Sequence, residues 1–211
     1  GEKIKIAVIE PALVKNQNSL RALYNLLPLD IQFINFWHFY ETIFEKVPLE
    51  EVGEEWFVEN IYNYRPLYDK IKRASEIALG VVLTALLFPL ALIISLFIAI
   101  TSKGPVVYSQ KRIGKNGKHF LLFKFRTMRN NHGGPLWTET NDDRITAAGK
   151  ILRLTHLDEL PQLINIIKGD ISLTGPRPER SELAEKYQEI PYYEIRHTIK
   201  PGLTGWAQIN F

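Results

Sequence analysis

The stretch IALGVVLTALLFPLALIISLFIAI, residues 77–100, decides the fold of this chain. No charged residue occurs between Glu76 and Lys103, and among the residues of this run only Thr84 and Ser95 are polar. A helix of about 20 apolar residues is long enough to cross the hydrocarbon core of a bilayer. The alternative is a buried core helix, but a soluble domain of this size rarely hides so long a segment that is apolar on every side. The sequence therefore predicts a helix embedded in a membrane.

Pro89 lies near the middle of this run, where it removes a backbone hydrogen bond and kinks or breaks the helix. Basic residues flank the run on both sides, and they are Lys70, Lys72 and Arg73 before it and Lys103, Lys111, Arg112, Lys115 and Lys118 after it. Positive residues favour the cytoplasmic side of a membrane, so both flanks are expected there. The prediction is a re-entrant helix over residues 74–102, broken at Pro89, and a single straight span is the alternative.

The composition sets limits on the remaining possibilities. The chain has 211 residues, of which 45% are hydrophobic and 23% are charged, as in a globular protein. A net charge of only +3 gives little support for binding to a polyanion, so no nucleic acid partner is expected. The absence of cysteine excludes disulfides, thiolate metal sites and cysteine nucleophiles. Residues 1–30 show no basic and apolar leader pattern, so no cleaved signal peptide is expected.

Residues 1–65 form the first predicted domain, a small α/β segment. Strands are expected at Ile4–Ile9 and Ile31–Phe36, with a helix at Ser19–Leu27 between them. This order resembles part of a doubly wound, Rossmann-like domain. No glycine occurs from Glu2 to Val52, so the glycine-rich phosphate turn of a dinucleotide site is missing. The segment is therefore expected to be a structural or regulatory appendage without a ligand.

The region after the membrane segment is predicted to be mainly helical, with one short β-hairpin. Two strands are expected within residues 105–128 about a turn at residues 114–117, and they place Lys124 and Arg126 on one strand face. A solvated strand face explains these two residues equally well. A polar loop follows, and one helix is expected to start at Asp142, and a second near Thr155.

Asp158 and Glu159 are the candidate catalytic residues, at the start of that second helix. Free backbone amides and the helix dipole stabilise negative charge there, and they also attract phosphate. Acidic residues in a first helical turn usually serve only as caps, so their neighbours matter. The segment Gly175–Pro178 is a stiff turn in which two prolines fix Arg177, and this suits two-point binding of a phosphate.

Further basic side chains are candidates for binding a diphosphate, since such a substrate needs more than one positive partner. These are Arg126, Arg153 and Arg180. Each of them taken alone is more typical of an ordinary surface residue. Their interpretation depends on the motifs around them.

Four strings in this order resemble the bacterial sugar transferase family, which comprises the monotopic phosphoglycosyl transferases. They are FKFRTM at 123–128, LDELPQ at 157–162, GDISL at 169–173 followed by GPRPE at 175–179, and KPGLTGW at 200–206. The resemblance covers residues 68–211. It implies a second domain at residues 66–211, with a catalytic region at 103–211, and a partial Rossmann-like segment and linker before it.

The resemblance also implies a reaction. Asp158 attacks the sugar-bearing phosphate of a UDP-sugar to form a covalent phosphosugar intermediate, and UMP leaves. Polyprenyl (undecaprenyl) phosphate then accepts the sugar-1-phosphate. Glu159 is expected to bind Mg²⁺. The residues expected to bind the substrate are Lys124, Arg126, Arg153, Arg177 and Arg180.

The expected partners are a UDP-sugar, polyprenyl phosphate and membrane lipids, and a homodimer is left open. The family places such chains in the bacterial cytoplasmic membrane, with the active site on its cytoplasmic face, at the first step of exopolysaccharide, O-antigen (lipopolysaccharide) or other glycoconjugate synthesis. The sequence does not specify the sugar. Two alternatives remain. A metal-dependent phosphohydrolase would use the same carboxylates and arginines with water as acceptor, and a membrane scaffold would use the motifs only to fold.

Overall fold

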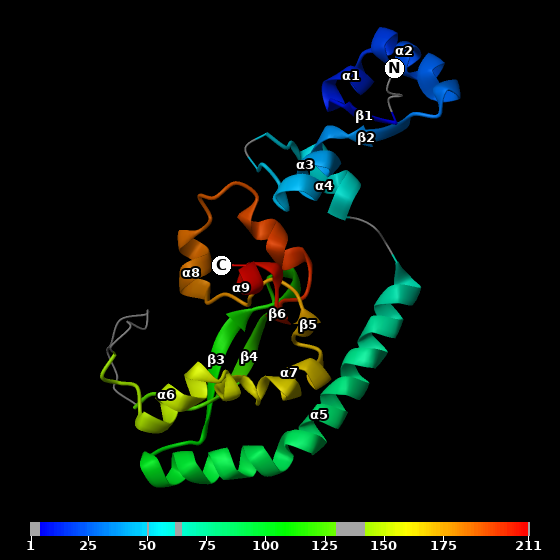
Figure 1. Cartoon of the computed structure of the whole chain (residues 1–211). Coiled ribbons are helices and arrows are strands. Elements are labelled where there is room, and N and C mark those ends of the chain that lie inside the picture. The colour runs from blue at the N-terminus through cyan, green and yellow to red at the C-terminus, as the bar shows by residue number, and fades with distance from the viewer. Residues whose placement is uncertain (1–4, 50, 62–64, 130–141, 211) are drawn as a thin grey trace. The chain divides into compact units, whose positions relative to one another are not determined.

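The chain forms two compact units, Gly1–Tyr64 and Arg65–Phe211 (Figure 1). The computed structural model describes residues 5–49, 51–61, 65–129 and 142–210. Most of the polar loop expected after Met128 lies outside the described residues.

The first unit contains a parallel pair of strands, β1 (Ile6–Ile9) and β2 (Gln32–Asn35), with Ile6 opposite Gln32. The connection between them is helical, as the sequence pattern predicts. Its helices are α1 (Pro11–Lys15), α2 (Gln17–Leu26) and the 3-10 turn η1 (Leu27–Leu29), and α3 (Phe36–Phe44) and α4 (Glu54–Ile61) follow β2. The unit is therefore an α/β segment with one strand-helix-strand step.

Helix α5 (Pro66–Thr101) opens the second unit and contains the whole apolar run. It starts eight residues before the predicted boundary because Pro66 occupies its first turn, where a missing N–H costs nothing. The helix continues past Pro89, so it does not end there as a break would require. Figure 1 shows α5 bent between its two ends. A bend is the expected effect of an internal proline, which removes one backbone hydrogen bond.

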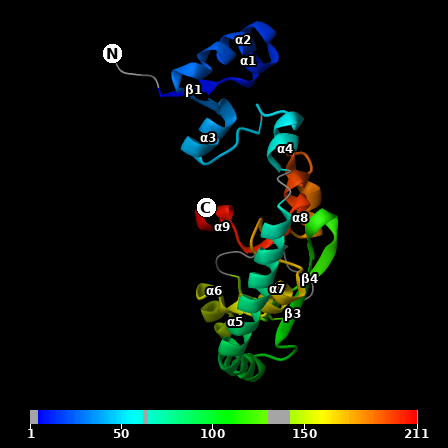
Figure 2. The same cartoon turned by 90° about the vertical axis from the view of Figure 1, so that its right-hand side faces the viewer.

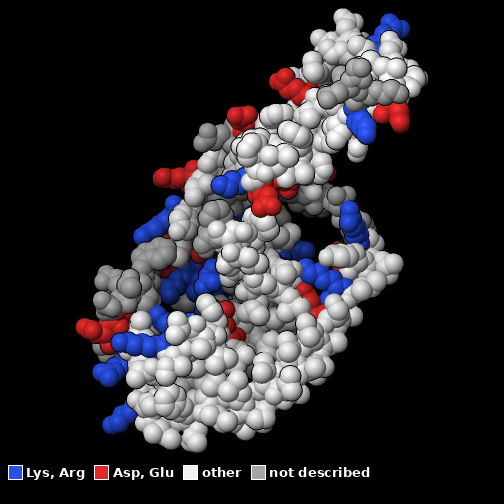
Figure 3. Space-filling view, in the orientation of Figure 1, with Lys and Arg blue, Asp and Glu red and all other residues white. Residues whose placement is uncertain are grey.

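The surface of α5 is largely apolar and exposed. Only Glu76, Gly80, Ile94 and Ile98 of this helix are buried. Leu86 is 70% exposed and Ile100 is 75% exposed. In Figure 3 the lower part of the view, over α5, lacks Lys, Arg, Asp and Glu apart from its left edge. The helix is long and apolar enough to cross a membrane, and 11% of its most apolar window is buried, which suggests membrane association.

The remaining elements of the second unit are short. The hairpin consists of β3 (Val107–Ile113) and β4 (His119–Phe125), which are antiparallel, and it confirms the predicted strand pair. The other elements are η2 (Lys115–Gly117), α6 (Ala147–Leu154), η3 (Leu157–Glu159), α7 (Gln162–Lys168), β5 (Ser172–Thr174), α8 (Ser181–Lys186), η4 (Tyr193–Thr198), β6 (Gly202–Thr204) and α9 (Trp206–Asn210). Strands β5 and β6 pair in parallel.

Both predicted helix starts in this region were wrong. Helix α6 starts after Thr146, whose hydroxyl accepts a hydrogen bond from the Gly149 amide at 2.9 Å. Asp142 does not cap a helix, since its carboxylate binds Arg144. The second helix is interrupted, because η3 is a separate 3-10 turn and α7 follows Pro161.

Two apolar clusters hold the hairpin, α6 and α7 against α5. Figures 1 and 2 both place α6 and α7 alongside α5. The buried members of one cluster are Ile94, Ile98, Phe125 and Leu152, and those of the other are Leu122, Leu163, Ile166 and Ile171. Asn165, which is fully buried, accepts from the Phe123 amide at 3.0 Å and donates to the Leu121 carbonyl at 2.7 Å. Strand β4 is therefore fixed beside α7 and the turn that precedes it.

Polar contacts also join α5 to α7 and β5. The Arg73 guanidinium donates to the Ile166 carbonyl at 2.6 Å and to the Ile167 carbonyl at 2.7 Å, close to the C-terminal end of α7. The buried Glu76 carboxylate accepts from the Ser172 hydroxyl and from the Leu173 amide. These bonds fix the N-terminal half of α5 to the segment that follows the acidic pair.

Candidate active site

The acidic pair lies in the 3-10 turn η3, between α6 and α7. His156, with φ of 55°, turns the chain from α6 into this turn. The amide of Glu159 binds the His156 carbonyl within the turn, so it is not free to hold an anion. The prediction that the pair sits in the first turn of an α-helix was therefore wrong. Asp158 is 7% exposed, and the Glu159 side chain is partly buried.

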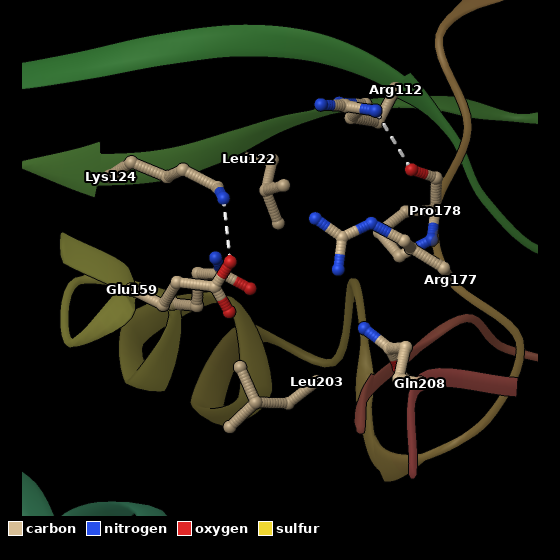
Figure 4. Close-up of a pocket in the computed structure, with 10 residues that line it drawn as sticks. Arg112, Leu122, Lys124, Glu159, Arg177, Pro178, Leu203 and Gln208 are labelled. Atoms are coloured by element: carbon tan, nitrogen blue, oxygen red, sulfur yellow. Dashed lines mark hydrogen bonds and ion pairs between the residues drawn. The ribbon is translucent and has the colours of Figure 1, made fainter. Parts of the chain in front are cut away.

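Two basic side chains surround the pair. Lys124, on β4, donates to the Glu159 carboxylate at 2.6 Å, as Figure 4 shows. Arg153, in the last turn of α6, donates from Nε to the Thr127 hydroxyl at 3.0 Å. Both positive charges act on Asp158. The hairpin and α6 thus bring two cations to the acidic turn.

Burial raises the pKa of Asp158 above its ordinary value, because a low-dielectric surrounding disfavours the charged carboxylate. The positive charge of Lys124 lowers the pKa, the negative charge of Glu159 raises it, and Arg153 lowers it. The net shift is upward. Asp158 is thus a poorly solvated carboxylate, which makes it more basic and more nucleophilic than an exposed aspartate when it is ionised.

A pocket lies next to this turn (Figure 4). Its lining residues are Arg112, Leu122, Lys124, Glu159, Gln162, Arg177, Pro178, Gly202, Leu203 and Gln208. Three of these side chains are basic and one is acidic, so the pocket favours an anion. In Figure 4, Lys124 and Glu159 lie at one side, and Arg112, Arg177 and Pro178 lie at the other.

Hydrogen bonds that involve its backbone atoms hold the Gly175–Pro178 turn in place. Arg112 donates from Nη1 to the Pro178 carbonyl at 2.9 Å, and Arg196 donates to the Arg177 carbonyl at 3.1 Å. The Gly175 amide binds the Thr204 carbonyl, and the Gly202 amide binds the Pro176 carbonyl, both at 2.9 Å. A side chain at either glycine would collide with the opposite backbone. The last motif, at residues 200–206, thus supports the turn that presents Arg177.

The structure brings most of the predicted site residues together. Glu159, Lys124 and Arg177 line the pocket, and the charges of Lys124 and Arg153 act on Asp158. Arg180 lies close enough to Arg112 for its charge to lower the pKa of that residue. These residues therefore belong to one region of the unit.

Arg126 binds the end of α5 through its guanidinium and does not line the pocket. It follows β4, is 5% exposed, and donates from Nη2 to the carbonyl and the hydroxyl of Ser102, both at 2.7 Å, at the C-terminal end of α5. It is absent from the residues that line the pocket. The expected shared strand face with Lys124 does not form, because β4 ends at Phe125.

Arg112, Gln162 and Gln208 line the pocket, although the sequence motifs gave no site role to them. A signal for Arg112 exists in the hairpin register. Gln110 pairs with Leu122 and Arg112 with Phe120, and side chains two residues apart share a face of a strand. Arg112 therefore shares a face with the pocket residue Leu122, but only a known register reveals this.

A magnesium ion is compatible with these side chains. Within residues 5–49, 51–61, 65–129 and 142–210 no group of three or more His, Asp or Glu side chains could hold a metal. Mg²⁺, however, is usually bound by one or two carboxylates together with substrate phosphates and water. Glu159 offers such a carboxylate, with one oxygen already paired to Lys124. The donor set fits a metal that is shared with a phosphate substrate.

Several bacterial proteins are similar to this chain in sequence. The chain is 42% identical over 172 residues to a UDP-N-acetylgalactosamine-undecaprenyl-phosphate N-acetylgalactosaminephosphotransferase of Aeromonas hydrophila, over 80% of this chain and 40% of the relative. It is 42% identical to the UDP-glucose:undecaprenyl-phosphate glucose-1-phosphate transferase of Escherichia coli K12, over 69% and 34% of the two chains. It is 41% identical to the exopolysaccharide production protein PSS of Rhizobium leguminosarum, over 66% and 74%.

The chain thus spans about two fifths and one third of the length of the first two relatives. The sequence model of the bacterial sugar transferase family matches residues 67–211. This range includes the pocket, the acidic pair and all of α5 except its first residue. The matched region is more than half of the chain. The chain belongs to the bacterial sugar transferase family.

Proposed function

We propose that this chain transfers a sugar-1-phosphate from a UDP-sugar to polyprenyl phosphate and releases UMP. The observation that carries the proposal is the buried Asp158 carboxylate, on which the positive charges of Lys124 and Arg153 act, next to a pocket lined by three cations. The names of the relatives support the donor and acceptor classes, since two of them name a UDP-sugar and undecaprenyl phosphate.

The proposed reaction has two displacements at one phosphorus atom. A carboxylate oxygen of Asp158 attacks the phosphorus that bears the sugar, and the bond from this phosphorus to the oxygen bridging the two phosphates breaks. UMP leaves with the electron pair. An oxygen of polyprenyl phosphate then attacks the same phosphorus and displaces the Asp158 carboxylate, which regenerates the enzyme.

The side chains around Asp158 have separate tasks in this scheme. Lys124 and Arg153 counter the negative charge of the sugar phosphate, which otherwise repels an attacking carboxylate. Arg177 binds phosphate oxygens from the other side of the pocket. Glu159 would hold Mg²⁺ together with the donor phosphates, and the ion would supply further neutralisation of their charge.

The exposed apolar surface of α5 suits an acceptor that is dissolved in a lipid bilayer. A polyprenyl chain stays in the hydrocarbon, so the enzyme must work at the membrane surface. We place the chain at the cytoplasmic membrane of a bacterium, with the pocket on the cytoplasmic face, where UDP-sugars are made. The product would begin a surface glycan such as an exopolysaccharide, and one relative is named for exopolysaccharide production.

The test follows a label in the sugar-side phosphate of the UDP-sugar. Without acceptor, an acid-quenched reaction should leave label on the protein. Added polyprenyl phosphate should move that label into the organic phase. Asp158→Asn should retain no label, whereas Asp143→Asn, which changes an exposed aspartate in the same region, should behave as the unmodified chain. Label released as free sugar phosphate without acceptor would indicate a hydrolase, and UDP-sugar that stays intact would indicate a scaffold.

A further inference from the structure

The charged groups at the pocket fall into two separate sets. The charges that act on Asp158 belong to Lys124, Glu159 and Arg153. A different set acts on Arg112, and it comprises Arg180, Arg177, Glu179 and Tyr108. In Figure 4, Leu122 lies between Lys124 of the first set and Arg177 of the second. The pocket therefore has one cationic end near the acidic turn and a second cationic end at Arg112 and Arg177.

Arg112 is held firmly at the second end. Its Nη1 donates to the Pro178 carbonyl at 2.9 Å, and its Nη2 donates to the Gln110 side chain at 2.8 Å. Its Nε is buried and has no hydrogen-bond partner in the described part of the chain. A guanidinium has five N–H donors and the two hydrogen bonds above use two of them, while Arg112 itself lines the pocket.

The positive charges at this end lie close enough to act on one another. The pKa of Arg112 is lowered to about 10, first by burial and then by the positive charges of Arg180 and Arg177, which together outweigh the opposite effect of Glu179. A cluster of partly buried cations that repel one another is costly unless an anion binds to it. The second end of the pocket thus favours an anionic group of the ligand.

We infer that Arg112 binds the nucleotide-side phosphate of the donor together with Arg177, while the sugar-side phosphate lies at the Lys124 end. This inference rests on the proposed function, because it assumes a nucleoside diphosphate donor. It assigns a direction to the substrate in the pocket. The charge that develops on the departing nucleoside monophosphate then appears beside Arg112, where donors are already in place.

The alternative is that Arg112 only supports the turn at Pro178. A purely supporting role would act through the turn that presents Arg177, so Arg112→Gln would cause no further loss of UMP binding in a chain that already carries Arg177→Gln. A phosphate-binding role causes a further loss of UMP binding in that chain, and leaves binding of the phosphate-free nucleoside uridine unaffected. UMP and uridine binding in the single and double variants therefore separate the roles.

The experiment measures binding of UMP and of uridine to the detergent-solubilised chain, for the unmodified protein, three single variants, and Arg177→Gln with and without Arg112→Gln. Arg112→Gln should weaken UMP binding about 10- to 100-fold, as expected for the loss of a charge-assisted hydrogen bond. Arg112→Lys should give a smaller loss, since an ammonium keeps the charge but cannot form the same set of bonds. Lys111→Gln is the matched control, because it removes the same charge from an exposed neighbour on β3 and should change UMP binding less than about twofold.

Uridine binding should be equal in all of these proteins. Unchanged UMP affinity in both Arg112 variants would overturn the inference, and so would an equal loss of UMP and uridine binding, or no further loss of UMP binding when Arg112→Gln is added to Arg177→Gln. The Lys variant keeps the test decisive if Arg112→Gln fails to fold. If the UMP measurements contradict the role of Arg112, labelling of Asp158 can still support the proposed function. Absence of that label would overturn the proposed function, whatever the UMP measurements show.

Discussion

Asp158 must be ionised to act as a nucleophile, and its burial opposes this. The positive charge of Lys124 offsets part of that effect by lowering the pKa of the carboxyl group. Lys124→Gln removes this charge, so the pKa of Asp158 should rise further. Activity that needs the carboxylate is lost as the pH falls through this pKa. The acid limb of the kcat/KM profile should therefore move to higher pH.

The measurement is a pH profile of kcat/KM between about pH 4 and 8. Lys118→Gln serves as the control, because Lys118 is an exposed lysine on the same hairpin. An acid limb that stays in place or moves to lower pH would show that Lys124 does not act on the ionisation that controls the rate.

Glu159 provides a second prediction at the residue scale. If its carboxylate holds Mg²⁺ against the donor phosphates, Glu159→Gln and removal of magnesium act on the same step. Each should remove most of the rate, and their combined effect should be much smaller than the product of the two. The rate is measured against magnesium concentration in both proteins. Full activity of the unmodified chain in excess chelator would remove the metal from the proposal.

The sequence motifs identified most of the residues at or beside the pocket, but they did not show how these residues are arranged in space. Asp158, Glu159, Lys124 and Arg177 lie in strings that point to a phosphate substrate, and the structure brings them together at or beside one pocket. Arg112 could not be assigned in this way, because its place depends on the pairing of β3 with β4. Periodicity along one strand reports which residues share a face, but it does not tell which face meets the pocket.

At the scale of elements, the contact of α5 with α7 positions the acidic turn. Arg73 donates hydrogen bonds to two carbonyls at the C-terminal end of α7, where the helix dipole also favours a positive charge. Arg73→Ala should leave both carbonyls without this donor and lower the free energy of unfolding by about 1 to 3 kcal/mol. Thermal unfolding in detergent measures the change. Lys70→Ala, an exposed change on the same helix, should have little effect, and equal losses in the two variants would contradict the role of Arg73.

The elements themselves were predictable to different degrees. The hairpin and the long apolar helix were found because alternation and unbroken apolarity are strong local signals. The helix starts near Asp142 and Thr155 were misplaced, because several residues in each stretch can serve as caps. Tertiary contacts decide among such candidates, as the placement of Thr146 against the Thr127 carbonyl illustrates.

At the scale of the whole molecule, the position of the second unit in a membrane decides whether its pocket can meet a lipid phosphate. Helix α5 is continuous and bent, with charged residues before and after its apolar run. A re-entrant helix returns both flanks to the cytoplasmic side, and a spanning helix separates them. The basic residues on both flanks favour re-entry. Lys70 and Lys118 should therefore face the same compartment.

Single cysteines at these two positions test the topology, because the chain has no cysteine of its own. Both lysines are exposed, so a thiol at either position should be reachable from the compartment that it faces. In intact cells an impermeant thiol reagent should label neither variant, and both should be labelled once the membrane is opened. Labelling of only one variant in intact cells would establish a spanning helix. Lys118 and Lys124 belong to the same hairpin, and Arg73 near the start of α5 binds α7. A spanning helix would place the start of α5 on the opposite side of the membrane from Asp158, so this contact could not form. That outcome would contradict both the re-entrant helix and the packing of α5 described above.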